Sequence, residues 1–289
     1  MTGELRHGLV LGNMADVADA DSLVAYAVAA EAAGWDGVFF IDHLVYPPEK
    51  HRAGADPWTT HAAIATRTDR IRLGSWVTPI PRRQPWQLAR DLATLDRLSD
   101  GRVILGAGLG TPEENERFGL PTDTRTLAER YDEALDVITG LWQGEPFSYD
   151  GEHFTIDEAT MLPTPVQEPR IPIVTGGFWP NRKPIRRGAR WDGIAPLSPG
   201  IRGVEDTGTR GGDVPESVEA ELRELVEYYH EVADEPGDVF LPVDFPGAPA
   251  DILDLYGDLG VTWALTTTWD EARRYDPSMD RIRDGPPDR

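Results

Sequence analysis

The sequence contains no cysteine, almost no lysine and no long hydrophobic run. The absence of cysteine excludes a disulfide framework, a thiolate nucleophile and a zinc–thiolate site. No apolar run approaches the roughly 18 residues of a membrane span, so we expect no membrane partner. The N-terminal residues MTGELRHGLV lack the charged-then-apolar order of a signal peptide, so we expect a cytoplasmic protein.

Positive charge is scarce throughout the chain. Lysine and arginine together number 28 against 50 aspartates and glutamates, which gives a formal net charge of −22. Such a field repels nucleic-acid phosphates, so we expect no nucleic-acid partner. Only Lys50 and Lys183 are lysines, and an acidic, lysine-poor composition is typical of a halophilic protein. A GC-rich genome would also explain scarce lysine, but it would not explain the net charge.

Short apolar, β-branched runs alternate with amphipathic stretches along most of the chain. The runs predict strands at 7–12, 37–41, 71–77, 102–107, 171–175, 192–196, 238–242 and 261–266. The stretches predict helices at 21–33, 57–67, 84–98, 124–142, 181–190, 215–232 and 248–257. Strands without polar alternation, each followed by a helix, favour a (β/α)8 TIM barrel. An open doubly wound sheet is the alternative, but no GxGxxG turn follows the first strand.

Several stretches are additional to the eight strand–helix units of a minimal barrel. Residues 108–121 and 197–214 follow the fourth and sixth strands, so we expect them as insertions at the C-terminal face, where they would cover a ligand. Residues 145–170 contain the pattern of a β-hairpin and then a proline-rich connection. We predict a single barrel domain over 1–275 and a polar, fraying tail over 276–289.

Polar residues follow two of the predicted strands at the end where barrels build their active sites. The second strand ends in Asp42 and His43, and an imidazole there can act as acid, base or hydrogen-bond donor. A structural aspartate beside an ordinary histidine is the alternative. After the fourth strand, Gly108 and Gly110 would admit a flat ring, and Glu113 follows them. Exposed carboxylates in such loops are more often simply solvated.

A glycine pair and a cluster of cations follow the fifth strand. Gly176 and Gly177 precede a predicted helix that carries Arg182, Lys183 and Arg186. A glycine pair that opens a helix presents free N–H groups and the positive end of the helix dipole, an arrangement typical of phosphate sites. We therefore predict an anion site here. The alternative is a helix whose arginines pair with nearby surface acids.

Other catalytic patterns are missing. The six histidines include no H-x-H or H-E-x-x-H motif, so we expect no metal site. There is no G-x-S-x-G motif and no P-loop. Acidic residues are so frequent that a metal-free barrel glycosidase, which needs a carboxylate pair, stays open as an alternative function.

Taken in order, four segments resemble the bacterial-luciferase-like flavin oxidoreductases, including their deazaflavin (F420)-dependent members. The resemblance covers roughly residues 5–196. The segments are EAAGWDGVFFIDHL (31–44), the stretch from DPWTT to GAGLG (56–110), PVQEPRIPIVTGGFWP (165–180) and ARWDGIAP (189–196). The C-terminal third matches only in length and periodicity.

This resemblance implies a TIM barrel that binds F420 or FMN at its mouth, with F420 slightly favoured. It implies hydride transfer to or from a small organic substrate, or O₂-dependent monooxygenation if the cofactor is FMN. A non-catalytic deazaflavin-binding protein is a further alternative. Family members are often homodimers, and the apolar faces at 57–67 and 84–98 permit one.

The resemblance also assigns residues to the site. Asp42 and His43 match the pair beside the ring, with His43 near the redox carbon and Glu113 near a family acid. Ser75–Trp76 falls where members often have a non-prolyl cis peptide that supports the ring. The remaining cofactor contacts that it implies are Gly108 and Gly110 at the ring, Gly176 and Gly177 at the phosphate, and Arg182, Lys183 and Arg186 at the acidic tail.

Overall fold

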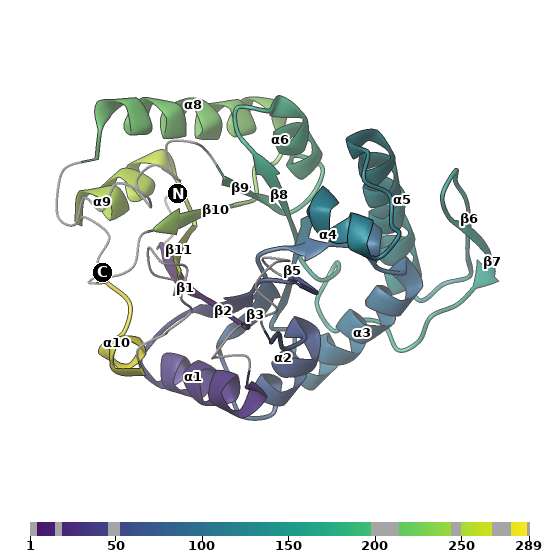
Figure 1. Ribbon diagram of the computed structural model, residues 1–289, viewed down its shortest axis with the longest axis horizontal. Helices are drawn as coiled ribbons and strands as arrows, with labels where there is room; N and C mark the ends of the chain where they lie inside the picture. Colours follow the sequence, from purple (N-terminus) through teal and green to yellow (C-terminus); the bar gives the residue numbers. More distant parts are fainter. Residues whose placement is uncertain are drawn as a thin grey trace.

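Parallel strands form a closed ring, and helices surround it (Figure 1). The computed structural model describes residues 5–14, 19–45, 53–197, 214–243, 250–267 and 279–287. The ring contains eight strands, which confirms the predicted TIM barrel. In spatial order they run β3, β2, β1, β11, β10, β9, β8 and β5, and pairing of β3 with β5 closes the ring. They are β1 (Arg6–Leu11), β2 (Gly37–Phe40), β3 (Arg72–Ser75), β5 (Val103–Gly108), β8 (Ile173–Phe178), β9 (Gly193–Leu197), β10 (Asp238–Val243) and β11 (Trp263–Thr267).

The helices lie outside the ring and begin at sequence-encoded signals. Asp19, Asp56, Asp123 and Asn181 each cap a helix by accepting a backbone N–H near its start. Prolines occupy the first turns of α2 and α3, where a missing N–H costs nothing. The helices are α1 (Ala20–Ala32), α2 (Pro57–Ala65), α3 (Pro85–Leu98), α5 (Thr124–Trp142), α6 (Arg182–Gly188), α8 (Glu216–Val232) and α9 (Ala250–Leu259). None of the described helices is long and apolar enough to cross a bilayer.

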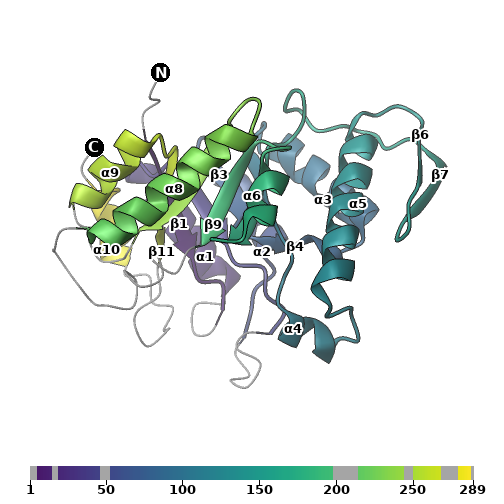
Figure 2. The ribbon, with the colours of Figure 1, turned by 90° about the horizontal axis from the view of Figure 1, so that it is seen from above.

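The predicted insertions have mixed outcomes. Residues 108–121 are not a plain loop, because they include the short helix α4 (Pro112–Arg117), which lies beyond the lower end of the strands in Figure 2. Residues 198–213, nearly all of the expected insertion after the sixth strand, lie outside the described residues. The expected hairpin forms as β6 (Phe147–Asp150) and β7 (Thr155–Ala159), outside α5 (Figures 1 and 2).

The expectation of a fraying C-terminal tail was wrong for part of that segment. Residues 279–284 form helix α10 (Met279–Asp284) beside α1 (Figure 1). Ile282 is fully buried, and its carbonyl accepts a hydrogen bond from Trp35 Nε1 at 3.0 Å. Burial of Ile282 and the hydrogen bond from the buried Trp35 indole thus hold this segment against the barrel.

Aromatic side chains fill the interior of the barrel. The rings of Phe240 and Trp263 stack with centroids 5.1 Å apart, and Phe39 meets both edge-on. A Cβ at Gly37 or Gly74 would lie 2.7–2.8 Å from the Phe39 ring, so these glycines make room for it. The interior of the barrel is therefore packed with side chains, and barrel enzymes bind their ligands at the carboxyl ends of the strands.

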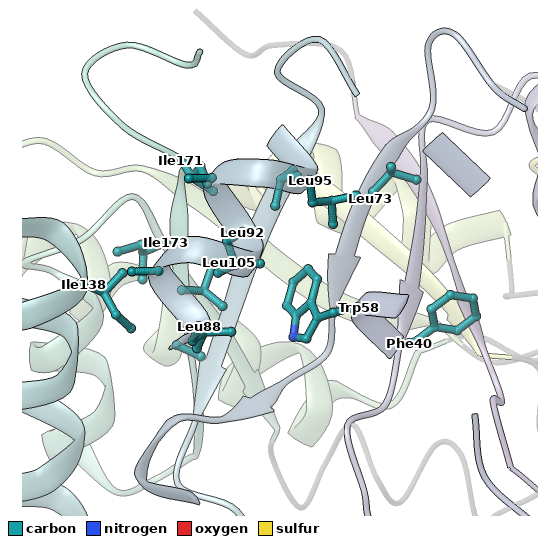
Figure 3. Packing of buried hydrophobic residues seen from close by; sticks show 14 of the residues in the cluster. Phe40, Trp58, Leu73, Leu88, Leu92, Leu95, Leu105, Ile138, Ile171 and Ile173 are labelled. Carbon is teal, nitrogen blue, oxygen red and sulfur yellow. The ribbon is translucent and has the colours of Figure 1, made fainter. Parts of the chain in front are cut away.

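A second core lies between the ring and the helices. Leu88 and Leu92 of α3 pack over Leu105 of β5 and Ile173 of β8, and Ile138 of α5 lies beside them (Figure 3). All these side chains are almost completely buried. This layer holds the carboxyl ends of neighbouring strands in fixed positions, and those ends carry the candidate site.

Candidate functional site

A buried group of ionisable side chains lies at the carboxyl ends of β2 and β3. We call it the mouth ion cluster and define it as Asp42, His43, Arg82, Arg83 and Glu114. Asp42, Arg82 and Glu114 have side-chain exposures of 2%, 5% and 1%. His43 and Arg83 are more accessible, at 16% and 23%. Three elements that are distant in sequence therefore meet here.

Asp42 is enclosed by guanidinium groups. Arg82 Nη2 donates to Asp42 Oδ1 and to the Asp42 carbonyl oxygen, both at 2.8 Å. Arg83 donates from Nε at 3.0 Å and from Nη2 at 2.7 Å to Asp42 Oδ2. Both carboxylate oxygens are thus engaged by arginine. The structure thus shows Asp42 as an anchor for two arginines, and its place beside a ring stays a prediction from the resemblance.

Glu114 is the other buried carboxylate of the cluster. Its Oε1 accepts the backbone N–H groups of Leu44 at 2.5 Å and Val45 at 2.8 Å. Its Oε2 accepts from Arg82 Nη1 at 2.6 Å and lies 3.3 Å from His43 Nδ1. Burial alone would raise the pKa of Glu114, but the hydrogen bonds from His43 and Val45 and the charge of Arg82 hold that pKa below its ordinary value. Glu114 is therefore ionised at neutral pH.

Local sequence explains why these residues meet. After β3 ends at Ser75, only the short strand β4 (Thr78–Pro79) and the 3-10 turn η2 (Ile80–Arg82) precede α3, which Pro85 opens, so Arg82 lies next to the strand ends. In α4, Pro112 opens the helix and Glu113 and Glu114 form its first turn. Glu114 points into the cluster, whereas Glu113, the residue expected in the site, is exposed.

A platform of backbone and apolar side chain adjoins the cluster. A non-prolyl cis peptide is present, but it joins Trp76 to Val77, one bond later than the Ser75–Trp76 position that we expected. Trp76 is partly exposed and contacts the interior aromatic layer, and its backbone N–H donates to the Phe40 carbonyl at 2.8 Å. Val77 is also partly exposed. These two residues form the inner surface of the mouth next to the end of β2.

Ser75 does not face this mouth. Its side chain is buried in the barrel wall and donates to the Gly106 carbonyl at 3.0 Å. It also accepts from Thr78 Oγ1, which in turn accepts from Trp58 Nε1 of α2. This hydrogen-bonded chain fixes the backbone under Val77, so Ser75 supports the platform from behind.

The glycines predicted to admit a ring mostly make room for protein atoms. A Cβ at Gly108 would lie 2.3 Å from Val77 Cγ2, and one at Gly176 would lie 3.1 Å from Val77 Cγ1. Gly110, at φ +80°, packs against Pro79. Glycines on two strands thus accommodate one valine, and Val77 presents the surface that a ligand at this point would contact.

The prediction that Gly176 and Gly177 open a helix was wrong. Gly176 and Gly177 belong to β8 and pair with Ala195 and Pro196 of β9. Helix α6 starts only at Arg182, after the cap Asn181, and Gly177 packs against Pro184 of that helix. The apolar strand simply continues through the glycines, because they create no break when a neighbouring strand pairs with them.

The cations of α6 lie on its outer surface. Arg182, Lys183 and Arg186 are exposed. Arg182 stacks on the Tyr228 ring at 4.6 Å and lies 3.5 Å from Glu224, and Arg186 donates to the Tyr228 hydroxyl at 3.2 Å. The cluster therefore has a feature of each hypothesis. Arg182 pairs weakly with an acid of α8, as the surface-pairing hypothesis expects, and all three cations remain accessible, as an anion site requires.

Sequence reasoning chose Glu113 instead of Glu114 and did not assign Arg82, Arg83 or Val77 to the site. A signal for Val77 existed in the small residues of the fourth and fifth strands, which need a bulky neighbour to fill the space. The choice between Glu113 and Glu114 had no such signal, because it depends on the rotation of a six-residue helix. Within the described ranges, no group of histidine and carboxylate side chains is arranged to hold a metal ion.

Comparison with known proteins decides the family. The family model described as luciferase-like monooxygenase matches residues 5–191. This chain belongs to the luciferase-like monooxygenase family. The resemblance drawn from the strand-end motifs is therefore confirmed.

This luciferase-like protein is also similar to curated proteins named for F420. It is 40% identical over 165 residues to the F420-dependent glucose-6-phosphate dehydrogenase of Beutenbergia cavernae, covering 55% of this chain and 47% of that one. It is 38% identical over 164 residues to the F420-dependent hydroxymycolic acid dehydrogenase of Mycobacterium tuberculosis, covering 54% and 44%. The chain thus spans about half the length of the curated relatives it matches.

Solved structures confirm the fold of this family member. An F420-dependent secondary alcohol dehydrogenase in complex with an F420–acetone adduct aligns with a TM-score of 0.74 at 16% identity, over 97% of this chain and 96% of that one. At such low identity the likeness concerns the fold alone.

Proposed function

We propose that this protein is an F420-dependent oxidoreductase that transfers hydride between the deazaflavin and a small organic substrate. F420 is favoured over FMN because the curated relatives described above are named as F420-dependent. When bound, the deazaflavin supplies the carbon that accepts or donates hydride. The protein contributes the surface on which the ring lies, a group for the proton and a site for the anionic arm.

The residues of the mouth fit a flat heterocycle. Val77 is held against Gly108 and Gly176, so its position is fixed by contacts on two strands. Together with Trp76 it gives a rigid apolar surface above the packed barrel floor. A planar ring can lie against such a surface without a large loss of side-chain entropy, because the surface is already ordered.

One observation carries the proposal, namely that His43 and the Trp76–Val77 platform lie at the ends of adjacent paired strands. β2 pairs with β3 up to Phe40 and Ser75, and His43 and Trp76 follow within three residues. An imidazole beside a ring-binding surface is placed to exchange a proton with a substrate stacked on that ring. Arg82 and Glu114 hold the backbone on either side of His43.

The anionic arm of the cofactor requires cations that remain accessible. Arg182, Lys183 and Arg186 on α6 follow the strand that carries Gly176 and Gly177, and we propose them as the site for the acidic tail of F420. FMN lacks that tail, so these residues would favour F420. In a chain with a net charge of −22, a group of three exposed cations would attract an anionic tail more strongly than its acidic surroundings do.

FMN-dependent monooxygenation is the second candidate, supported by the shared family and by the same platform. A glycosidase fits poorly, since it needs one carboxyl group with a raised pKa. Glu114 instead has a lowered pKa, and both oxygens of Asp42 are bonded to arginine. Glu114 is therefore ionised and cannot act as the acid, and the oxygens of Asp42 are already engaged by arginine.

The test is cofactor uptake followed by turnover. F420 and FMN are titrated separately into the full chain at high salt, and binding is followed by fluorescence. Turnover is then measured with a panel of small alcohols and ketones. We expect tighter binding of F420 and a loss of about 10²- to 10⁴-fold in turnover for His43→Ala, with the F420 Kd changed less than about threefold.

His230→Ala, on the exposed face of α8, is the matched control and should retain full turnover. Uptake of neither cofactor would refute the proposal. Equal losses of turnover and affinity in His43→Ala would make His43 a binding residue.

A further inference from the structure

The surroundings of Glu114 determine which nitrogen of His43 carries its proton. An ionised carboxylate accepts hydrogen bonds and donates none. Three of its four neighbours are groups that only donate, namely the N–H groups of Leu44 and Val45 and the guanidinium of Arg82. The fourth is His43 Nδ1, 3.3 Å from Oε2. A lone pair on Nδ1 would face a negative oxygen, so Nδ1 must carry hydrogen.

We propose that Glu114 is a positioning residue that holds neutral His43 as the Nδ1–H tautomer and thereby makes Nε2 the atom that exchanges a proton with the substrate. The inference rests on the proposed function and deepens it. A carboxylate that orients a catalytic imidazole through Nδ1–H is a recurrent solution to this problem in enzymes. Here the carboxylate comes from α4, a segment absent from a minimal barrel.

The proposed step balances in the direction of alcohol oxidation. The hydroxyl proton of the substrate passes to Nε2 of His43, and the carbon–oxygen double bond forms. With a deazaflavin bound, the carbon–hydrogen bond would break and its electron pair would leave with the hydrogen to the cofactor, so the alcohol would be oxidised by two electrons and the cofactor would be reduced by two. In the reverse direction the same Nε2 returns the proton to the carbonyl oxygen.

Arg82 prevents the carboxylate from turning away. It donates to Glu114 through Nη1 and to Asp42 through Nη2, and Arg83 fixes the other oxygen of Asp42. The two backbone bonds to Oε1 constrain Glu114 from the opposite side. Oε2, which Arg82 also holds, is the oxygen that faces His43. The orientation of the imidazole is therefore set by a rigid, almost completely buried group.

The first test measures the tautomer directly. Full-length protein labelled with ¹⁵N-histidine is examined by long-range ¹H–¹⁵N NMR at about pH 9, above the ordinary imidazole pKa. The His43 signals are assigned by their loss in His43→Gln. We expect a protonated Nδ1 and an unprotonated Nε2. A protonated Nε2 in the wild type would overturn the inference, and this result does not depend on any variant that fails to fold.

The second test uses a matched pair of neighbouring glutamates. Glu114→Gln replaces a carboxylate, which only accepts hydrogen bonds, by an amide whose NH2 group would face the N–H donors around it. Glu113→Gln, in contrast, changes an exposed side chain one residue away. We expect Glu114→Gln to shift the tautomer and to lower kcat by about 10- to 100-fold, with the F420 Kd within about threefold. Glu113→Gln should match the wild type. An unchanged tautomer and kcat in Glu114→Gln would refute the role of Glu114.

Failure of this inference can be distinguished from failure of the proposed function. An Nδ1–H tautomer in a protein that takes up no F420 would refute the proposed function and leave the proton assignment in place. An Nε2–H tautomer with normal F420 turnover would refute this inference alone.

Discussion

Arg82 and Arg182 place the same side chain in opposite surroundings near the mouth of the barrel. Arg82 is 5% exposed and bridges two buried carboxylates at 2.6–2.8 Å. Arg182 is 55% exposed and lies 3.5 Å from an acid on the next helix. The first arginine fixes geometry, because moving it would leave buried charges without partners. The second is screened by solvent and stays available to an added anion.

The largest expected difference between the two arginines is in stability. Arg82→Met removes the shared partner of Asp42 and Glu114, so the free energy of unfolding should fall by about 3–5 kcal/mol. Arg182→Met should change it by less than about 1 kcal/mol. Urea denaturation at one salt concentration measures both. Similar losses in the two variants would show that burial does not separate these sites.

The dependence of stability on acid pH tests a second buried group, the His61 imidazole, which lies on α2 and bonds to the β3 backbone. Burial lowers the pKa of His61 to about 4, although its bond to the Gly74 carbonyl and the charge of Asp56 oppose this. Below the ordinary value of 6.5, the unfolded chain gains a proton that the folded chain refuses. Stability should therefore fall as the pH drops from 6.5 to 4, by about 3 kcal/mol in all.

His61→Gln keeps a donor for the Gly74 carbonyl and does not titrate, so it serves as the reference. The difference in unfolding free energy between wild type and variant is measured against pH. It separates the contribution of His61 from those of the carboxylates and the other histidines. A difference that stays constant from pH 7 to pH 4 would contradict this assignment.

Changes in the Trp76–Val77 platform should have an effect of intermediate size on stability. Gly108→Ala would place a methyl group 2.3 Å from Val77 Cγ2, so it should cost about 1–3 kcal/mol and weaken F420 binding. Adding Val77→Ala should restore most of the stability but not the binding. Gly257→Ala, in α9 with nothing within 4 Å, is the control and should stabilise slightly. Additive effects of the two platform changes in denaturation experiments would show that they do not interact.

The exposed cations should show the smallest effect on stability and a selective effect on binding. Replacing Arg182 and Arg186 together by Gln should lower F420 affinity roughly threefold to tenfold at low salt and leave FMN affinity unchanged. The difference should shrink as salt is added. Arg70→Gln, at the amino end of β3, is the control. Equal weakening of both cofactors in fluorescence titrations would refute the placement of the tail.

The sequence predicted the barrel well because each strand–helix unit has its own local signal. Buried strands lack polar alternation, and capping residues and prolines mark where helices begin, so the expected ranges lie within a few residues of those observed. The position of His43 at a strand end was also visible, because it follows directly from the end of the apolar run 37–41.

Local patterns failed where packing between distant segments decides. Gly176 and Gly177 look like a turn, but pairing with β9 keeps them in a strand. The choice of Glu114 over Glu113 depends on how α4 rotates against residues 44 and 45. Val77 occupies space that glycines on β5 and β8 leave open, and neither strand adjoins it in sequence.

The amino-acid sequence by itself determined the class of fold, the order of its elements and the imidazole at the mouth, because periodicity and chain order carry that information. Only the tertiary structure decided which charges are buried together, which side chain forms the platform and which glutamate faces His43. Those outcomes depend on contacts between residues 30 or more positions apart, such as Arg82 with Glu114 and His43 with Glu114. Short-range propensities do not encode such contacts, since each depends on how the closed barrel packs its strand ends together.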